Sequence, residues 1–199
     1  MKKPILIPVL TILISAAVLL AAAFGFNGIA AENAQKHHLS LMQMLLPGSS
    51  EFTLEPYSGE DANIRSVHKA ENGFVIETVT YGYAGNITMY IGINNSGKVT
   101  GLVVRDLSET FGLGAEALTD HVFLAQFLNS SGTFEAVTGA PDAFSGATGT
   151  VTETDGDTVE IDALTGATVT SKAIVRAVNS AVAYVTGADA TSAATSWGG

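Results

Sequence analysis

The residues best suited to chemistry form the run Asp162-Ala163-Leu164-Thr165-Gly166-Ala167-Thr168, which stands where a short apolar segment gives way to a helical pattern. The first turn of a helix carries unpaired N–H groups and the positive end of the helix dipole. Gly166 allows the backbone to come close to a ligand, and Ala167 keeps that approach narrow. Such a junction is suited to holding a phosphate group.

Polar side chains crowd the same junction. Lys172 and Arg176 lie one turn apart on the following helix and supply positive charge in an acidic chain. Four hydroxyl groups lie close together in the sequence, on Thr165, Thr168, Thr170 and Ser171. The residues alone leave an alternative open, because a helix capped by Ser or Thr after a glycine turn needs no ligand.

The pattern Asp-x-x-Ser/Thr-Gly-Ala-Thr before a helix resembles the attachment motif of the FMN-binding domain family. Members include the G subunit of the Rnf ion-pumping electron-transport complex and the C subunit of the sodium-pumping NADH:quinone reductase. In that family a flavin transferase joins the FMN phosphate to the hydroxyl of the last Thr as a phosphoester. The resemblance implies covalent FMN on Thr168, with Asp162 as the acidic residue of the transferase motif. The other expected cofactor contacts at this junction are Thr165, Gly166, Ala167 and Lys172.

A second block of the chain resembles the same family. Gly82-Tyr83-Ala84-Gly85, Ile87–Ile93, Gly97-Lys98-Val99 and Phe123–Phe127 follow the order of its central region. Glu109-Thr110-Phe111-Gly112-Leu113-Gly114 is similar to the family's Glu-Thr-Pro-Gly-Leu-Gly, which lines the flavin site. Phe111 replaces the proline, so this loop departs from the family pattern at that position. The match makes flavin-site candidates of Glu109, Thr110, Leu113 and Gly114.

A run similar to the attachment motif, Asp142–Thr148, occurs 20 residues upstream and makes Thr148 a rival or second acceptor. The following segment, Gly149–Glu153, has neither a helical period nor a basic residue, so it offers no helix dipole to a phosphate. We expect a turn near the flavin here, with Phe144 available to pack on the ring.

The elements that must position these residues indicate an α+β domain with a mainly antiparallel sheet and flanking helices. Apolar and polar side chains alternate along Ile87–Ile93, as in a half-buried strand, and Asn94–Gly97 predicts a hairpin turn. Apolar positions at helical spacing predict a helix over Val169–Val185. The predicted helices cover 32–46, 120–128 and 169–185, and the predicted strands cover 74–81, 87–93, 99–104 and 158–162.

These elements supply the core candidates. The last helix should bury Ile174, Val178, Ala181, Val182 and Val185, and helix 120–128 offers Val122, Phe123, Phe127 and Leu128. In a β-rich domain Tyr81, Tyr83 and Tyr90 are also expected in the core, with contact to a flavin ring as the alternative.

The first 31 residues predict a transmembrane anchor. No charged side chain occurs from Pro4 to Ala31, and the apolar run Ile5–Phe26 spans about 33 Å as a helix, close to a hydrocarbon core of about 30 Å. Lys2 and Lys3 predict a cytoplasmic N-terminus, with the rest of the chain outside. A cleaved signal peptide is the alternative, although the run exceeds the usual signal core of about 7–15 residues.

The amino-acid composition of the chain excludes several classes of function. Lys2 and Lys3 are the only charged residues before Glu32, so the rest of the chain carries 7 basic and 19 acidic side chains, a net charge of −12. Such a surface repels phosphate backbones, and nucleic acid is not an expected partner. The chain contains no cysteine, which excludes disulfides, iron–sulfur ligation and thiol catalysis. No spacing indicates a metal site, so redox chemistry requires a bound organic cofactor.

Together these features predict an electron-carrier subunit in the cytoplasmic membrane of a prokaryote, with no independent activity and no catalytic residue of its own. The resemblance implies an Rnf-type complex that moves electrons between ferredoxin and NAD⁺ and couples them to Na⁺ or H⁺ transport. It also implies membrane and iron–sulfur subunits as partners, and a flavin transferase. We expect an anchor over 1–31, an FMN-binding domain over 32–187 and a flexible tail over 188–199.

Three alternatives remain open. The chain could be a membrane-tethered, non-redox binding or scaffold module that grips a free phosphate ligand at the same junction. It could be the C subunit of a Na⁺-translocating NADH:quinone reductase, although its length and single anchor resemble the Rnf subunit more. A stand-alone flavin reductase would need a substrate site that the sequence does not provide.

Overall fold

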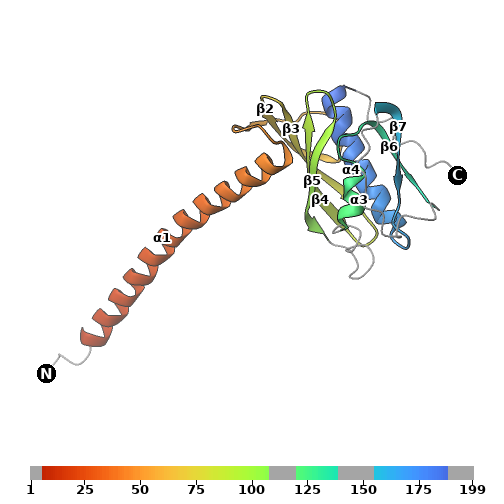
Figure 1. The fold of residues 1–199 in the computed structure, drawn as a ribbon. Coiled ribbons are helices and arrows are strands. Elements are labelled where there is room, and N and C mark those ends of the chain that lie inside the picture. Colours follow the sequence, from red (N-terminus) through yellow and green to blue (C-terminus); the bar gives the residue numbers. More distant parts are fainter. Residues whose placement is uncertain (1–5, 108–119, 139–154, 188–199) are drawn as a thin grey trace. The chain divides into compact units, whose positions relative to one another are not determined.

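The computed structural model describes residues 6–107, 120–138 and 155–187, except the side chains of 6–8, 22–31, 106–107 and 155–157. The chain divides into two compact units, Met1–Leu41 and Met42–Gly199. Figure 1 shows the elements in order: α1 (Leu6–Leu45), β1 (Thr53–Glu55), β2 (Ile64–Ala70), β3 (Gly73–Tyr81), β4 (Asn86–Asn94), β5 (Val99–Leu107), α3 (His121–Ala125), β6 (Ser131–Val137), β7 (Asp155–Asp162) and α4 (Thr168–Thr186).

Helix α1 ends at Leu45, just before Pro47-Gly48, which confirms the helix predicted over 32–46. Within the described parts of the chain, no helix offers a stretch that is both long and apolar enough to cross a membrane. The predicted anchor covers residues 1–31, and the side chains of 1–8 and 22–31 lie outside the described residues. The anchor and its topology therefore stay predictions.

Strands β1 to β5 form an antiparallel sheet in sequence order, which confirms an α+β fold with an antiparallel sheet. The predicted hairpin joins β4 to β5: the Asn94 N–H donates to the Lys98 carbonyl at 2.9 Å, and the Gly97 N–H donates to the Asn94 carbonyl at 2.9 Å. Gly97 takes a φ of +79°, which a side chain would disfavour.

Four strands depart from the prediction. β1 and β2 precede the first predicted strand, and β6 lies between the predicted strands 99–104 and 158–162. β7 begins at Asp155, earlier than predicted, and pairs with β6 in parallel as a second, two-stranded sheet. Helix α3 has only five residues within the predicted 120–128, because the chain after Ala125 continues as turns.

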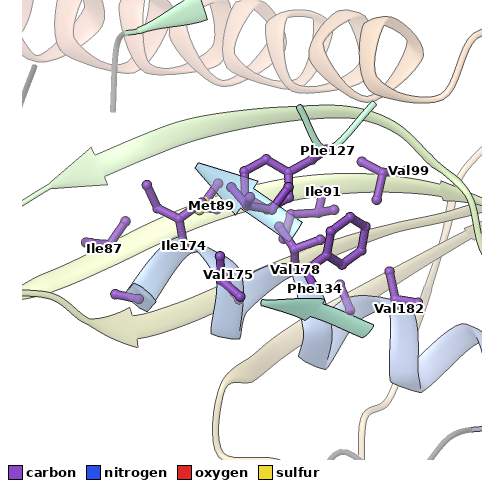
Figure 2. Close-up of a cluster of buried hydrophobic side chains, with 14 of the residues drawn as sticks. Ile87, Met89, Ile91, Val99, Phe127, Phe134, Ile174, Val175, Val178 and Val182 are labelled. Atoms are coloured by element: carbon purple, nitrogen blue, oxygen red, sulfur yellow. The ribbon is translucent and has the colours of Figure 1, made fainter. Parts of the chain in front are cut away.

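Helix α4 packs its apolar face against the sheet, as Figure 2 shows for Ile174 and Val178 near Met89 and Ile91. Val185 is partly buried against the same core. The rest of the predicted helix face is also buried: Ile174, Val178, Ala181 and Val182. The Phe127 and Phe134 rings lie in the same core, with their centroids 5.4 Å apart. Full burial of one such side chain stabilises a fold by about 1.5–3 kcal/mol.

Some core candidates lie at the surface instead. Val122 is 48% exposed, since α3 buries Phe123 and packs Leu124 partly against the core instead. Tyr81 and Tyr83 are also exposed, because β3 ends at Tyr81 and the chain then turns, so the prediction of a core position is wrong for both. Tyr90 is buried as predicted.

The opposite face of the sheet receives the last turn of α1. Gly92 and Gly101 are paired across β4 and β5, and both lie against the Leu45 backbone. The Thr100 hydroxyl donates to the Leu45 carbonyl at 2.6 Å. Two facing glycines therefore form the surface on which the helix end rests.

Candidate functional site at the start of helix α4

Helix α4 begins directly after a tight turn that the sequence motif builds. Strand β7 ends at Asp162, and the Ala167 N–H donates to the Leu164 carbonyl at 3.0 Å, which closes the turn. Gly166 occupies its third position with a φ of +81°, a left-handed conformation that glycine adopts without steric cost. The turn delivers Thr168 as the first residue of the helix.

Ser171 holds this turn from the buried side. Its hydroxyl accepts a hydrogen bond from the Leu164 N–H at 3.2 Å and donates one to the Ala167 carbonyl at 3.0 Å. The Ser171 N–H donates to the same carbonyl at 2.9 Å. Because one buried side chain bonds both ends of the turn, the start of α4 has a defined geometry.

A second set of hydrogen bonds joins the end of β7 to the segment after α3. The Gln126 side chain accepts from the Asp162 N–H at 2.8 Å and donates to the Asp162 carbonyl at 3.3 Å. The Ala163 N–H donates to the Val137 carbonyl at 2.9 Å. The sequence carried no signal for this role of Gln126, because a lone amide near a short helix has no distinctive pattern.

The start of α4 has the electrostatic character of an anion site. Ala167 precedes the helix and its side chain has no oxygen, and no side chain of the described residues caps the helix. The N–H groups of the first turn and the positive end of the dipole are therefore available to an anion. Thr165 and Gly166 are exposed, and Thr168 is half-buried.

The two cations predicted for this site, Lys172 and Arg176, lie apart. Lys172 is half-buried and lies four residues after Thr168, so both occupy one face of the helix. Arg176 lies another turn along, about 12 Å from Thr168 on the helix axis. Its Nη2 donates to the Tyr81 carbonyl at 2.8 Å, and burial lowers the pKa of its guanidinium. The prediction that Arg176 helps to hold a phosphate is not supported by this geometry.

The four hydroxyl groups predicted to cluster at this site also lie on different sides of the helix start. Thr165 and Thr168 reach the surface, whereas Thr170 and Ser171 are buried on the other side of the helix start. Successive helix positions differ by about 100°, so residues 168, 170 and 171 cannot all face one ligand. Asp162 is half-buried at the end of β7.

The remaining site predictions fall outside the described residues. They concern Glu109, Thr110, Leu113 and Gly114 of the second block and the alternative acceptor Thr148.

A cavity of about 420 Å³ lies elsewhere in the Met42–Gly199 unit, beside Ser49, Glu55 and Lys69. It shares no residue with the turn before α4. Its lining is mixed in charge, since the Lys69 ammonium pairs with the Glu55 carboxylate at 3.3 Å.

Comparison with known proteins decides the family. Residues 82–183, just over half of the chain, match the family model described as the FMN-binding domain. The chain belongs to the FMN-binding domain family. The match begins at the turn between β3 and β4 and includes the predicted attachment motif and most of α4.

Two curated relatives of this FMN-binding domain are G subunits of ferredoxin:NAD⁺ oxidoreductase complexes. The G subunit of the Na⁺-translocating ferredoxin:NAD⁺ oxidoreductase complex of Acetobacterium woodii is 34% identical over 111 residues, which cover 55% of this chain and 47% of that protein. The G subunit of the proton-translocating ferredoxin:NAD⁺ oxidoreductase complex of Clostridium ljungdahlii is 33% identical over 113 residues, which cover 57% and 53%. The chain thus spans about half the length of the curated relatives it matches.

Among solved structures, the chain is similar to Shewanella oneidensis NqrC. The match has a TM-score of 0.43 and 20% sequence identity, and it covers 63% of this chain and 61% of the other.

The start of α4 fits the phosphate end of FMN. A helix start that no described side chain caps and the Lys172 cation both stabilise negative charge, and Thr168 shares one helix face with Lys172. Gly166 leaves the approach open because it has no side chain. The donor set therefore suits a phosphate group, whereas the covalent bond and the individual residue roles stay predictions.

Proposed function

We propose that this chain is an electron-carrier subunit of a membrane redox complex and carries FMN on Thr168 through a phosphoester. One observation carries the proposal: in a chain of the FMN-binding domain family, Thr168 opens an uncapped helix directly after an exposed glycine turn. A threonine in that position offers its hydroxyl beside the N–H groups that stabilise a phosphate.

The proposed attachment forms one bond at the Thr168 hydroxyl. The donor is a flavin dinucleotide: the Thr168 oxygen bonds to its flavin-bearing phosphorus, the pyrophosphate P–O bond breaks, and the nucleoside monophosphate leaves with the hydroxyl proton, so the chain gains one FMN less one water. A flavin transferase supplies this step. The motif residues Asp162, Thr165, Gly166 and Ala167 serve recognition and access, and Lys172 balances the charge of the phosphate diester.

The chain's own residues hold the FMN in place and do not react themselves. FMN supplies the redox chemistry when bound, and the protein sets its position and surroundings. The bonds from Ser171 and Gln126 keep the attachment turn in one place, and a covalent tether keeps the carrier near its neighbours at high effective concentration. Glu109, Thr110, Leu113 and Gly114 are proposed to line the flavin site.

The curated relatives suggest which complex the subunit serves. Both are named as G subunits of ferredoxin:NAD⁺ oxidoreductase complexes, one Na⁺-translocating and one proton-translocating. We extend this to an Rnf-type complex in which the chain relays electrons between ferredoxin and NAD⁺, coupled to Na⁺ or H⁺ transport. Its partners are then the other membrane and iron–sulfur subunits.

The anchor belongs to the same proposal. Residues 1–31 hold the chain in the cytoplasmic membrane of a prokaryote, with the N-terminus in the cytoplasm and the flavin domain outside. The uncharged run Ile5–Phe26 behind Lys2 and Lys3 supports this topology. Carbonate washing of membranes should leave the full chain bound, and release of a chain that begins near Ala31 would favour a cleaved signal instead.

Intact-mass spectrometry with peptide mapping tests the attachment. The full chain, produced together with a flavin transferase, should gain one FMN less one water, and its denatured form should fluoresce. Thr168→Ala should lose the adduct completely, and Thr168→Ser should keep part of it because the hydroxyl remains. Thr148→Ala should leave the mass increase unchanged.

Two other outcomes of this experiment would contradict the proposal. An adduct that persists in Thr168→Ala and disappears in Thr148→Ala would move the acceptor to Thr148. A colourless wild-type chain without any mass increase would overturn the covalent carrier and favour the non-redox binding module.

A further inference from the structure

Two side-chain amides bond to the outer edges of the small sheet formed by β6 and β7. Within the described residues no third strand joins this sheet, which lies beside α4 in Figure 1. On the β6 edge, the Asn179 amide accepts from the Phe134 N–H and donates to the Phe134 carbonyl, both at 2.8 Å. On the β7 edge, the Gln126 amide accepts from the Asp162 N–H at 2.8 Å and donates to the Asp162 carbonyl at 3.3 Å. Each amide therefore bonds one strand residue as a neighbouring antiparallel strand would.

The bonds from Gln126 fix the direction of the Asp162 side chain. The Asp162 N–H and carbonyl belong to the two peptide planes on either side of its Cα atom, and only φ and ψ turn these planes relative to each other. One amide that bonds both planes therefore restrains both dihedral angles, and with them the direction of the Cα–Cβ bond. Side chains alternate along a strand, so Asp162 points away from the buried Ile161, to the outer face that also carries the exposed Glu160.

Gln126 is itself held by the core. Phe123 and Phe127, before and after it in the chain, are both buried, and their ring centroids lie 5.7 Å apart. The Gln126 N–H donates to the Phe123 carbonyl at 3.3 Å. The place of the amide is therefore set by packing outside the attachment motif.

The backbone between Asp162 and the attachment turn is bonded at each step. The N–H groups of residues 162, 163 and 164 all have partners in other parts of the fold, namely the Gln126 amide, the Val137 carbonyl and the Ser171 hydroxyl. The direction set at Asp162 is therefore kept relative to Thr168, which lies six residues later in the chain.

We infer that Gln126 is a positioning residue for FMN attachment, which holds the Asp162 carboxylate in the direction at which a flavin transferase meets it. This inference rests on the proposed attachment at Thr168. Asp162 is the acidic residue of the proposed motif, and an enzyme that recognises this motif contacts Asp162 and Thr168 in the same encounter. A carboxylate already held in one place relative to the acceptor hydroxyl lowers the entropy lost in that encounter.

The rate of FMN attachment tests the role of Gln126, and Asn179 supplies the matched control. Gln126→Met and Asn179→Leu keep the approximate shape of each side chain and remove both of its hydrogen bonds. Intact mass follows adduct formation on the full chain in detergent with FAD and a flavin transferase. Gln126→Met should lower kcat/KM for the chain about tenfold, because a small misplacement of reacting groups is costly.

The control should behave differently although it loses the same number of hydrogen bonds. Phe134 lies three positions before Val137, the β6 partner of Asp162, which is about 10 Å along the sheet. Attachment to Asn179→Leu should therefore stay within about twofold of the wild type. Urea unfolding checks that both variants are folded under the assay conditions. If Gln126→Met does not fold, Gln126→Glu replaces it; this variant keeps the acceptor for the Asp162 N–H and should show a smaller loss in the same direction.

A second substitution separates positioning from a merely structural role. Asp162→Asn keeps the shape of the side chain and removes its charge, and it should slow attachment. In this background Gln126→Met should slow attachment by less than about twofold more, because the carboxylate that Gln126 positions is absent. A structural role would repeat the full loss seen in the wild-type background. If Asp162→Asn forms no adduct at all, the comparison with Asn179→Leu decides.

Four results would overturn the inference and leave the proposed attachment in place. With the adduct on Thr168 of the wild type, these are an unchanged rate in Gln126→Met, an equal loss in Asn179→Leu, an unchanged rate in Asp162→Asn, and a full repeat of the Gln126→Met loss in the Asp162→Asn background. If no adduct forms on the wild-type chain, the proposed attachment and this inference fall together.

Discussion

At the scale of single residues, the attachment turn depends on one buried hydroxyl. The Ser171 side chain bonds the Leu164 N–H and the Ala167 carbonyl, and no side chain among the described residues caps the helix in its place. Ser171→Ala leaves the Leu164 N–H without this buried partner, and an unsatisfied buried donor costs about 1–3 kcal/mol. We expect the free energy of unfolding to fall by about that amount.

Urea unfolding of the flavin-free chain measures this difference. The midpoint should fall while the slope of free energy against urea stays the same. Thr165→Ala is the control on the same turn, and because Thr165 is exposed its change should stay within about 0.5 kcal/mol. Equal midpoints for Ser171→Ala and the wild type would show that the turn does not depend on this hydroxyl.

The site residues differ in how far the sequence could reveal them. Thr165, Gly166 and Thr168 were identifiable because the turn and the helix start are local, and local bonding follows the order of the residues. The hydrogen bonds between the Gln126 side chain and the Asp162 backbone could not be predicted, because the two residues are 36 positions apart and meet only in the tertiary fold. The hydrogen bond from Arg176 to the Tyr81 carbonyl was not identifiable for a similar reason, since that carbonyl lies on a strand distant in the sequence.

At the scale of elements, a regular pattern decided what could be predicted. β4 and α4 each carry one uninterrupted apolar face that packs in the core, so alternation and helical spacing were visible in the sequence, although Tyr90 and Gly92 on the second face of β4 are buried as well. In β2 a bulge between Ile64 and Ser66 shifts the register, so Ile64 and Val67 face inward three positions apart and the alternation is lost. The parallel pairing of β6 with β7 is set by tertiary contacts, which no local pattern records.

The two facing glycines of the sheet give a prediction at this scale. A Cβ atom at Gly92 would stand 2.7 Å from the Leu45 carbonyl carbon and 2.8 Å from the Thr100 hydroxyl. Since real Cβ atoms do not approach backbone so closely, Gly92→Ala must displace the last turn of α1. We expect a loss of about 1–3 kcal/mol of folding free energy, as for other overpacked sites.

Substitution of the neighbouring Gly101 should give a smaller loss of stability, which provides a comparison. At Gly101 the nearest Leu45 atoms stand 3.0 Å from the built Cβ, so a small shift relieves the contact and Gly101→Ala should destabilise less than Gly92→Ala. Thermal unfolding of the full chain in detergent ranks the two variants. The reverse order, or no loss in either, would mean that the helix end does not rest on these glycines.

At the scale of the whole molecule, polar contacts tie distant segments together. On the face of the sheet away from α4, Arg105 donates to the Tyr90 hydroxyl, Tyr90 bonds Glu77, and Ser66 donates to Glu77 at 2.8 Å. These four side chains cross β5, β4, β3 and β2. At the C-terminal end of α4, Tyr184 bonds Glu55 of the edge strand β1, and Lys69 pairs with the same carboxylate at 3.3 Å.

Tyr90, which is buried, and Tyr184, which is partly buried, should make the fold sensitive to alkaline pH. Burial first, and then the negative charge of Glu77, raises the pKa of Tyr90, although the nearby Arg105 lowers it in part. Burial and Glu55 raise the pKa of Tyr184 in the same way. Above the ordinary tyrosine value of 10.0, the unfolded chain therefore releases these protons before the folded chain does. Because the folded state then binds more protons, the free energy of unfolding must fall as pH rises.

Urea unfolding of the wild type, Tyr90→Phe and Tyr184→Phe across this range checks the sign. From about pH 7 to pH 9 each variant should be less stable than the wild type by a constant amount, because a hydrogen bond is lost and tyrosine stays neutral in both states. Above pH 10 the wild type should lose stability more steeply than either variant, so the difference should shrink. A difference that stays constant, or grows, above pH 10 would show that Glu77 and Glu55 do not hold these phenols in the protonated form.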